Sequence, residues 1–212
     1  MNALVNALHN ELQISKSSTI IEELFHIQTQ SRVTCCSCKT ADTTTERTAF
    51  LPLLLPLPKL HPQQNCLLLE DLLSFFFEED TLDGDYYCQK CDTMTQAKQK
   101  TSLRHPLPRV IIIQLKRFTF DDSNNKIHTL VKYPLQKLNV RKYLAQTSNN
   151  QQETETIYHL IAVSRHTGSS VRSGHYTTYA KHFVTGAWHH FNDNYIESVR
   201  DKKTVFVTRP MC

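Results

Sequence analysis

The spacing of apolar residues predicts short helices in the first part of the chain. Thr19 and Glu22 form a capping-box pattern ahead of a short helix over Ile20–Phe25. Asn65 is placed to cap a further helix over residues 67–77. An amphipathic helix is also expected over the first dozen residues, where apolar side chains recur at helical spacing: Met1, Leu4, Val5, Leu8 and Leu12.

The later part of the chain has the pattern of β-strands. Residues 110–115 are a continuous apolar, β-branched run, which is typical of a buried strand. Earlier, prolines interrupt the apolar residues 47–57, so that an edge strand running into a loop is expected there. Four more strands are predicted, with a turn at Thr185 and Gly186 between the second and third: residues 158–164, 176–181, 188–191 and 204–207.

Composition limits the classes of protein that fit. The 212 residues suffice for one ordinary domain, and 24 basic against 20 acidic residues give a formal charge of +4 without basic blocks. Such a balance gives little support to a nucleic-acid binder. An apolar run of about 18 residues, as a membrane span requires, is missing, and the start does not resemble a signal peptide. We therefore expect an intracellular protein of the cytoplasm or nucleus, with no membrane partner.

Four of the seven cysteines form two C-x-x-C pairs, Cys35 with Cys38 and Cys88 with Cys91. In a long chain without a secretion signal, such pairs favour a metal over disulfides. Two C-x-x-C turns complete a closed tetrahedral zinc site, which is structural and not catalytic. Unrelated thiols or a redox pair are the alternatives, but both pairs share the same spacing and neither follows a thioredoxin-like pattern. One structural zinc ion is predicted.

The remaining cysteines do not suggest a second site. Cys36 competes with Cys35 as a ligand, but only one residue separates it from Cys38, which is too short for the usual turn. Buried, inert thiols are the simplest interpretation of Cys66 and Cys212.

His175 is the candidate general base. Three of the four glycines of the chain lie in the segment around it: Gly168, Gly174 and Gly186. Glycine is favoured where the backbone turns sharply or approaches another chain closely, so this segment is a candidate site. A general base needs a partner on its second ring nitrogen. Strands folding back on each other around Gly186 would bring Asn192 and Asp193 to His175.

Six ordered segments together resemble the C-terminal two thirds of the catalytic domain of ubiquitin-specific proteases, the papain-like cysteine deubiquitinases. Residues 107–118, LPRVIIIQLKRF, are similar to a strand of that family, and residues 158–179, YHLIAVSRHTGSSVRSGHYTTY, are similar to its histidine box. The other segments are residues 8–12, residues 21–38 with the first cysteine pair, residues 69–91 with the second pair, and residues 188–193, WHHFND.

The resemblance implies a partial papain-like cysteine peptidase fold of the α+β class. An antiparallel β palm would be joined to zinc-ribbon fingers, with short N-terminal helices from an incomplete thumb. One partial catalytic domain is expected over residues 1–208. It would comprise the end of the thumb helices at 1–28, the fingers at 29–109 and the palm with the histidine box at 110–208.

The resemblance also implies a thiol hydrolase. His175 would take the proton of a cysteine thiol. Asn192 would orient the imidazole through its carboxamide oxygen, and Asp193 would be a second orienting group or a polar contributor near the oxyanion. The substrate would be ubiquitin linked through its C-terminal glycine, so ubiquitin and ubiquitinated proteins are the expected partners.

The chain departs from the family pattern at the nucleophile. The family's nucleophilic cysteine lies in an Asn-x-x-Cys pattern that a glutamine-rich box follows, and neither is found in these 212 residues. Of the other thiols, Cys36, Cys66 and Cys212 do not fit that position. The predicted helix that begins at residue 1 has no preceding cap, which suggests a piece of something longer. We therefore expect this chain to be inactive alone.

Two other functions remain open from the sequence. The chain would be a nonenzymatic ubiquitin-binding zinc-ribbon module if the histidine were a relic. A zinc-ribbon nucleic-acid protein is favoured only by the small positive charge, and the acidic run at residues 78–85 argues against it.

Overall fold

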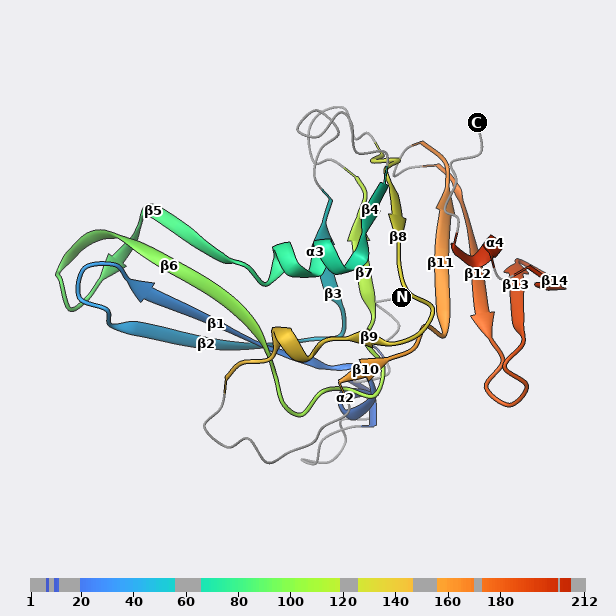
Figure 1. Ribbon diagram of the computed structural model, residues 1–212, viewed down its shortest axis with the longest axis horizontal. Helices are drawn as coiled ribbons and strands as arrows, with labels where there is room; N and C mark the ends of the chain where they lie inside the picture. The colour runs from blue at the N-terminus through green and yellow to red at the C-terminus, as the bar shows by residue number, and fades with distance from the viewer. Residues whose placement is uncertain are drawn as a thin grey trace. The chain divides into compact units, whose positions relative to one another are not determined.

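The computed structural model describes residues 7, 10–11, 20–55, 66–118, 126–146, 156–169, 173–201 and 203–206. Figure 1 labels the helices and strands. By its internal contacts the chain divides into two compact units. Unit 1 comprises residues 1–53, 73–114 and 139–158, and unit 2 comprises residues 54–72, 115–138 and 159–212. Residues 7, 10 and 11 are helical, and the rest of the helix predicted for the first dozen residues lies outside the described residues.

A four-stranded antiparallel sheet is the main element of unit 1. Its strands pair in the order β2-β1-β6-β5. Their bounds are Ile27–Cys35 for β1, Ala41–Thr48 for β2, Glu79–Cys88 for β5 and Thr93–Arg104 for β6. Threonine and other residues that favour strands are frequent here, but few side chains are buried, and the pattern of β6 leaves only Ala97 and Leu103 inside. The sequence pattern did not predict these long polar strands, because they have no continuous apolar face.

Helix α2 spans Ile20–Phe25, as predicted, whereas its predicted cap Thr19 lies outside the described residues. Its buried Ile21 packs with Ala49, and the half-buried Phe25 and Phe50 contact the same cluster. Burial of this small apolar face stabilises a helix that is too short to persist alone.

Helix α3 spans Leu69–Phe76, two residues later than predicted at its start. Residues Cys66–Leu68 instead form β4, which pairs in parallel with β8, Leu130–Lys132. The helix buries Leu72 and Leu73, whereas Phe75 is 69% exposed. The partners of β4 lie more than sixty positions along the chain, so the local helical pattern did not reveal the strand.

The remaining short strands form two pairs. Strand β3, Leu51–Leu54, pairs with β7, Ile113–Lys116, and β9, Leu138–Asn139, pairs with β10, Ile157–Tyr158. A 3-10 helix follows β9 at Arg141–Tyr143. Strand β3 agrees with the strand expected within residues 47–57.

Two predicted strands are shorter than their apolar patterns suggest. The run at 110–115 yields only β7, because the Val110 N–H donates to the Leu24 carbonyl oxygen, a residue of helix α2. The segment 158–164 breaks between β10 and β11, where the Leu160 N–H donates to the Leu135 carbonyl oxygen. In both cases a backbone N–H donates to a distant loop or helix end and so does not bond to a neighbouring strand.

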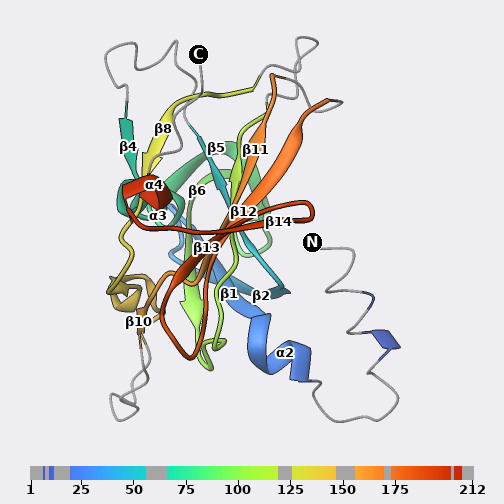
Figure 2. The ribbon, with the colours of Figure 1, turned by 90° about the vertical axis from the view of Figure 1, so that its right-hand side faces the viewer.

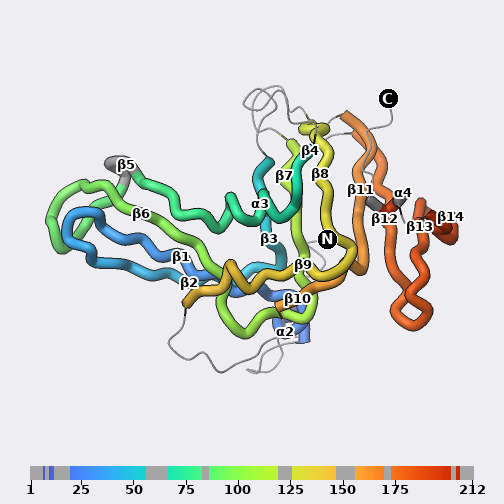
Figure 3. Tube along the Cα trace, in the orientation of Figure 1, coloured from blue at the N-terminus to red at the C-terminus, as the bar shows by residue number. Residues whose placement is uncertain are grey.

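A second four-stranded antiparallel sheet belongs to unit 2, and its strands follow one another in Figure 3, whereas Figure 2 shows β11 and β12 next to each other. They pair in the order β11-β12-β13-β14, with bounds Ala162–Thr167, His175–Lys181, Trp188–Asn192 and Tyr195–Ser198. Strands β12 and β13 and the turn at Gly186, with φ 69°, agree with the sequence prediction. Strand β14 was not predicted.

The strand predicted at residues 204–207 is wrong over residues 204–206, because Lys203–Phe206 forms helix α4, and Val207 lies outside the described residues. The N–H and hydroxyl of Thr204 both donate to the Asp201 carbonyl oxygen, at 3.0 and 2.7 Å, which closes a helical turn. Val205 is fully buried, and its carbonyl oxygen accepts from Tyr133 at 2.7 Å and Arg165 at 2.9 Å. These tertiary contacts override the strand propensity of the β-branched residues.

The fold class is mixed α and β, with mostly antiparallel sheets and few helices, as predicted. The finer division into residues 1–28, 29–109 and 110–208 stays a prediction. Within the described ranges, no helix reaches the length and apolarity that crossing a bilayer requires.

Candidate functional site

Two similar turns carry the cysteine pairs. The first joins β1 to β2 and holds Cys35 and Cys38, and the second joins β5 to β6 and holds Cys88 and Cys91. In each turn the N–H of the fourth residue after the first cysteine donates back to that cysteine's carbonyl oxygen, at 3.1 and 2.8 Å. These fourth residues, Lys39 and Asp92, both have positive φ, 61° and 53°. Pairing of β1 with β6 aligns Cys35 with Ala97 and so brings the turns together.

The four sulfur atoms lie close enough to share one ion. Cys35 Sγ lies 3.9 Å from Cys91 Sγ, and Cys38 Sγ lies 3.5 Å from Cys88 Sγ. All four sulfur atoms are within 4.8 Å of one another. A tetrahedral zinc ion with Zn–S bonds of about 2.3 Å separates its ligands by about 3.8 Å. The donor set therefore fits zinc.

Hydrogen bonds around the cluster affect the thiols unequally. The Thr95 side chain, followed by the Cys38 backbone, lowers the pKa of Cys35 to about 5. A hydrogen bond with the Thr40 side chain lowers the pKa of Cys38. The pKa of Cys91 is raised to about 12, first by its hydrogen bond to Cys38. The first turn thus favours the thiolate form that binds metal.

Cys36 is not a member of the four-cysteine cluster. Its backbone N–H donates to the Gln96 carbonyl oxygen at 2.9 Å, which fixes the first turn against β6. Among the other thiols, Cys66 Sγ contacts the Leu67 carbonyl oxygen at 3.7 Å, and Cys212 lies outside the described residues.

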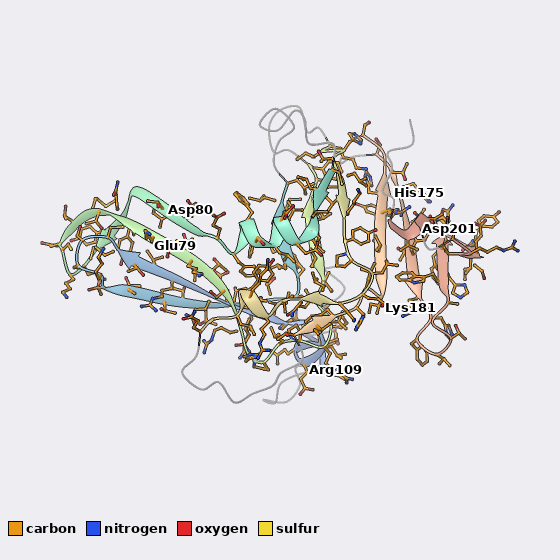
Figure 4. All side chains as sticks on the ribbon, in the orientation of Figure 1. Glu79, Asp80, Arg109, His175, Lys181 and Asp201 are labelled. Atoms are coloured by element: carbon orange, nitrogen blue, oxygen red, sulfur yellow. The ribbon has the colours of Figure 1, made fainter. Side chains whose placement is uncertain are left out.

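His175 opens strand β12, and Figure 4 labels it and Lys181 at the two ends of that strand. The β12–β13 hairpin pairs Thr178 with Phe191, so the chain at Asn192 returns toward the start of β12. His175 Nε2 lies 2.6 Å from Asn192 Oδ1. Because a carboxamide oxygen only accepts, the proton of the neutral ring lies on Nε2, and Nδ1 keeps its lone pair.

Asp193 takes a different position. Its carboxylate Oδ2 lies 3.9 Å from His175 Nε2, beyond hydrogen-bond distance, and its side chain is 75% exposed. With φ at 49°, Asp193 is part of the tight turn between β13 and β14. The structure thus brings all three residues together, with Asn192 as the direct partner and Asp193 as a nearby charge.

Two further residues of this region, Lys126 and His166, were not predicted from the sequence. Lys126 Nζ lies 3.2 Å from Nδ1 of His166 and donates to the His166 carbonyl oxygen at 2.5 Å. His166 lies inside the segment that resembles a histidine box, but nothing in its spacing distinguished it from the other histidines. Its ring also lies near Tyr176 and Phe118, with centroids 4.8 and 5.5 Å away.

The family model described as ubiquitin carboxyl-terminal hydrolase matches residues 1–210. Ubiquitin carboxyl-terminal hydrolase 2 of Gallus gallus is 34% identical over 177 residues, covering 82% of this chain and 46% of that protein. Ubiquitin carboxyl-terminal hydrolase 3 of Homo sapiens is 34% identical over 207 residues, covering 92% of this chain and 38% of that protein. The chain thus spans less than half the length of these relatives.

Solved structures show the same fold. The SAGA DUB module bound to ubiquitin aldehyde contains a chain with a TM-score of 0.77 and 24% identity, covering 96% of this chain and 45% of that chain. The SAGA DUB module bound to monoubiquitin contains one with a TM-score of 0.73 and 25% identity, covering 95% and 42%.

Proposed function

The chain belongs to the ubiquitin carboxyl-terminal hydrolase family, and on that premise we propose that it is part of a cysteine-dependent deubiquitinase. In this proposal it supplies the general-base histidine and a zinc ribbon. The bond cleaved is the isopeptide or peptide bond after the C-terminal glycine of ubiquitin.

The observation that carries the proposal is the hydrogen bond of 2.6 Å between His175 Nε2 and Asn192 Oδ1. It leaves Nδ1 free to take the proton of a thiol, and the thiolate then attacks the glycine carbonyl carbon. The tetrahedral intermediate collapses to a thioester as the imidazolium returns its proton to the leaving amine. Water, deprotonated by the same imidazole, hydrolyses the thioester and regenerates the thiol.

In this proposal the nucleophile comes from outside these 212 residues, because none of their thiols lies in the Asn-x-x-Cys pattern that the family resemblance implies. Four of the thiols form the cluster that could hold a metal ion, and Cys66 Sγ contacts the carbonyl oxygen of the next residue, Leu67. Without a thiolate there is no covalent intermediate, and an oriented imidazole does not replace it. We therefore propose that this chain does not turn over substrate alone.

The cysteine cluster is proposed to hold one structural zinc ion. Cys35, Cys38, Cys88 and Cys91 would be its ligands. With four protein ligands the site has no open position, so the ion would supply stability and no catalytic step. It would tie the β1–β2 turn to the β5–β6 turn, at a sheet end where few apolar side chains are buried.

Ubiquitin is the proposed partner, which is supported by the ubiquitin-bound state of similar structures. A nonenzymatic ubiquitin-binding module is the second candidate function, because the proposed inactivity of this chain leaves binding as its measurable property. Neither function requires a nucleic acid.

Two measurements on the full chain test the proposal. Titration of isotope-labelled ubiquitin should shift resonances of its C-terminal tail, and a ubiquitin without its last two glycines is the matched control. Unchanged tail resonances would contradict the proposal. A ubiquitin carrying a C-terminal electrophile should not label the chain, and labelling at Cys36, Cys66 or Cys212 would show that the chain has its own nucleophile.

A further inference from the structure

At His175 the backbone of strand β12 pairs with a neighbouring strand on one side only. In the β12 ladder His175 pairs with Thr167 of β11, whereas pairing with β13 begins at Thr178. The side chain of His175 is 48% exposed. The direction in which the His175 ring leaves strand β12 therefore depends on the end of β11 and on Gly174, the residue before His175.

Gly174 rests on the ring of His166. A Cβ atom added at Gly174 would lie 2.1 Å from His166 Nε2 and 2.5 Å from the Thr167 carbonyl oxygen. At Gly168 an added Cβ would lie 3.3 Å from His166 Cε1 and 2.7 Å from the Ser173 carbonyl oxygen. Both glycines have positive φ, 157° and 134°. Glycine is thus required at Gly174 because the imidazole edge of His166 and the Thr167 carbonyl oxygen lie so close, and at Gly168 chiefly because the backbone of residues 173 and 174 does.

The ring of His166 is itself held in place. Lys126 Nζ donates to Nδ1 at 3.2 Å and to the backbone carbonyl oxygen of the same residue at 2.5 Å. Because an ammonium group only donates, Nδ1 accepts, and the proton of the neutral ring lies on Nε2, the edge that faces Gly174. Burial, with the nearby Lys126 charge, lowers the pKa of His166, which favours this neutral form.

We propose that His166 is a positioning residue for His175. Its imidazole, anchored by Lys126, presents its Nε2 edge to Gly174 and so sets the backbone from which the His175 ring reaches Asn192. The role rests on the proposed function, since it matters only if His175 is the general base. His166 itself does not touch substrate or the nucleophile.

Substitutions separate the support from the anchor. His166→Ala removes the ring and the acceptor for Lys126. The variant His166→Phe keeps a ring edge at Gly174 without the acceptor, and His166→Asn keeps an acceptor near Nδ1 without the far ring edge. In all three variants Lys126 keeps its bond to the backbone carbonyl oxygen. His159→Ala, at an exposed histidine of the same unit, is the control.

The test measures the ring nitrogen resonances of His175 in the isotope-labelled full chain, assigned with His175→Gln. A ring held by Asn192 in one tautomer gives two widely separated resonances, whereas exchange between tautomers averages them. The separation should fall at least by half in His166→Ala and His166→Asn and be retained in His166→Phe and His159→Ala. Circular dichroism establishes that each variant is folded.

The outcomes distinguish this proposal from the proposed function. Averaged resonances in the unsubstituted chain would contradict the fixed base of the proposed function. A wide separation that survives in folded His166→Ala would overturn the positioning role alone. If His166→Ala does not fold, equal spectra of His166→Phe and His166→Asn would overturn it.

Discussion

The carboxamide oxygen of Asn192 lies 2.6 Å from Nε2 of His175 and is the nearest hydrogen-bond partner that the structure gives this ring. The two residues are 17 positions apart in sequence. They come together because β12 and β13 form an antiparallel hairpin, which brings the end of β13 back to the start of β12. The next residue, Asp193, approaches the same nitrogen only to 3.9 Å. The adjacent polar residues are therefore not equivalent.

Replacing Asn192 should release the His175 ring. A neutral hydrogen bond contributes about 1 kcal/mol, so Asn192→Ala should reduce the preference for the Nε2-protonated tautomer about fivefold. The ring nitrogen shifts of His175 report this ratio. Asp193→Asn is the matched control, because asparagine tolerates the positive φ at this turn and removes only the charge. Equal effects of both substitutions would be evidence against Asn192 as the orienting residue.

Metal content should distinguish two neighbouring cysteines. Cys35→Ser removes a member of the four-sulfur cluster, and we expect it to lower the zinc content from one ion per chain and to destabilise the sheet of β1, β2, β5 and β6. Cys36→Ser alters a residue outside the cluster and should leave one ion bound. Elemental analysis with thermal unfolding measures both effects. Full zinc content in Cys35→Ser, or none in the unsubstituted chain, would refute the site.

Helix α3 offers a comparison of two side chains of similar apolar character. Leu73 is 1% exposed, so Leu73→Ala leaves a cavity and should lower the free energy of unfolding by about 2 to 5 kcal/mol. Phe75, two residues later, is 69% exposed, and Phe75→Ala should change that free energy by less than about 0.5 kcal/mol. Urea unfolding measures both values. A similar loss in the two variants would mean that α3 buries a different face.

Acid should destabilise the chain in part through His166. Burial and the Lys126 charge hold the pKa of this ring below its ordinary value of 6.5. The unfolded chain then binds a proton at a higher pH than the folded chain, so stability falls as pH drops below about 6.5. His166→Phe removes this contribution and should lose less stability between about pH 7.5 and about pH 5.5.

Urea unfolding of both proteins at the two pH values gives the comparison. Acid also weakens metal binding by thiolates, but that loss is common to both proteins and cancels in the difference. If the loss in His166→Phe equals that of the unsubstituted chain, the pKa of His166 is not depressed by folding.

Features set by short stretches of sequence were predictable. The capping pattern predicted α2, because Thr19 and Glu22 are three positions apart in the sequence, just where the helix Ile20–Phe25 begins. The positive φ that glycine permits at Gly186 allowed the β12–β13 turn to be predicted. Spacing also favoured Cys35 over Cys36, and Cys35 is the member of the cluster.

Features set by distant partners were not predictable. Residues 204–207 have strand propensity, but Arg165 and Tyr133 donate to the carbonyl oxygen of Val205, and Lys203–Phe206 folds as α4. The long strands β1 and β6 have few buried residues. Their sequences therefore lack the alternating apolar residues from which a strand could be predicted. A backbone donor that finds its acceptor far along the chain leaves no local pattern.

By itself, the sequence determined which residue types were present for the chemistry: two pairs of thiols at metal-binding spacing and a histidine framed by glycines. Only the tertiary structure decided that Asn192 and not Asp193 contacts the ring, and that the edge of His166 lies beneath Gly174. The physical reason is that strand register sets the distances between side chains from different strands. A change of one residue in register would turn each of these side chains to the opposite face of the sheet.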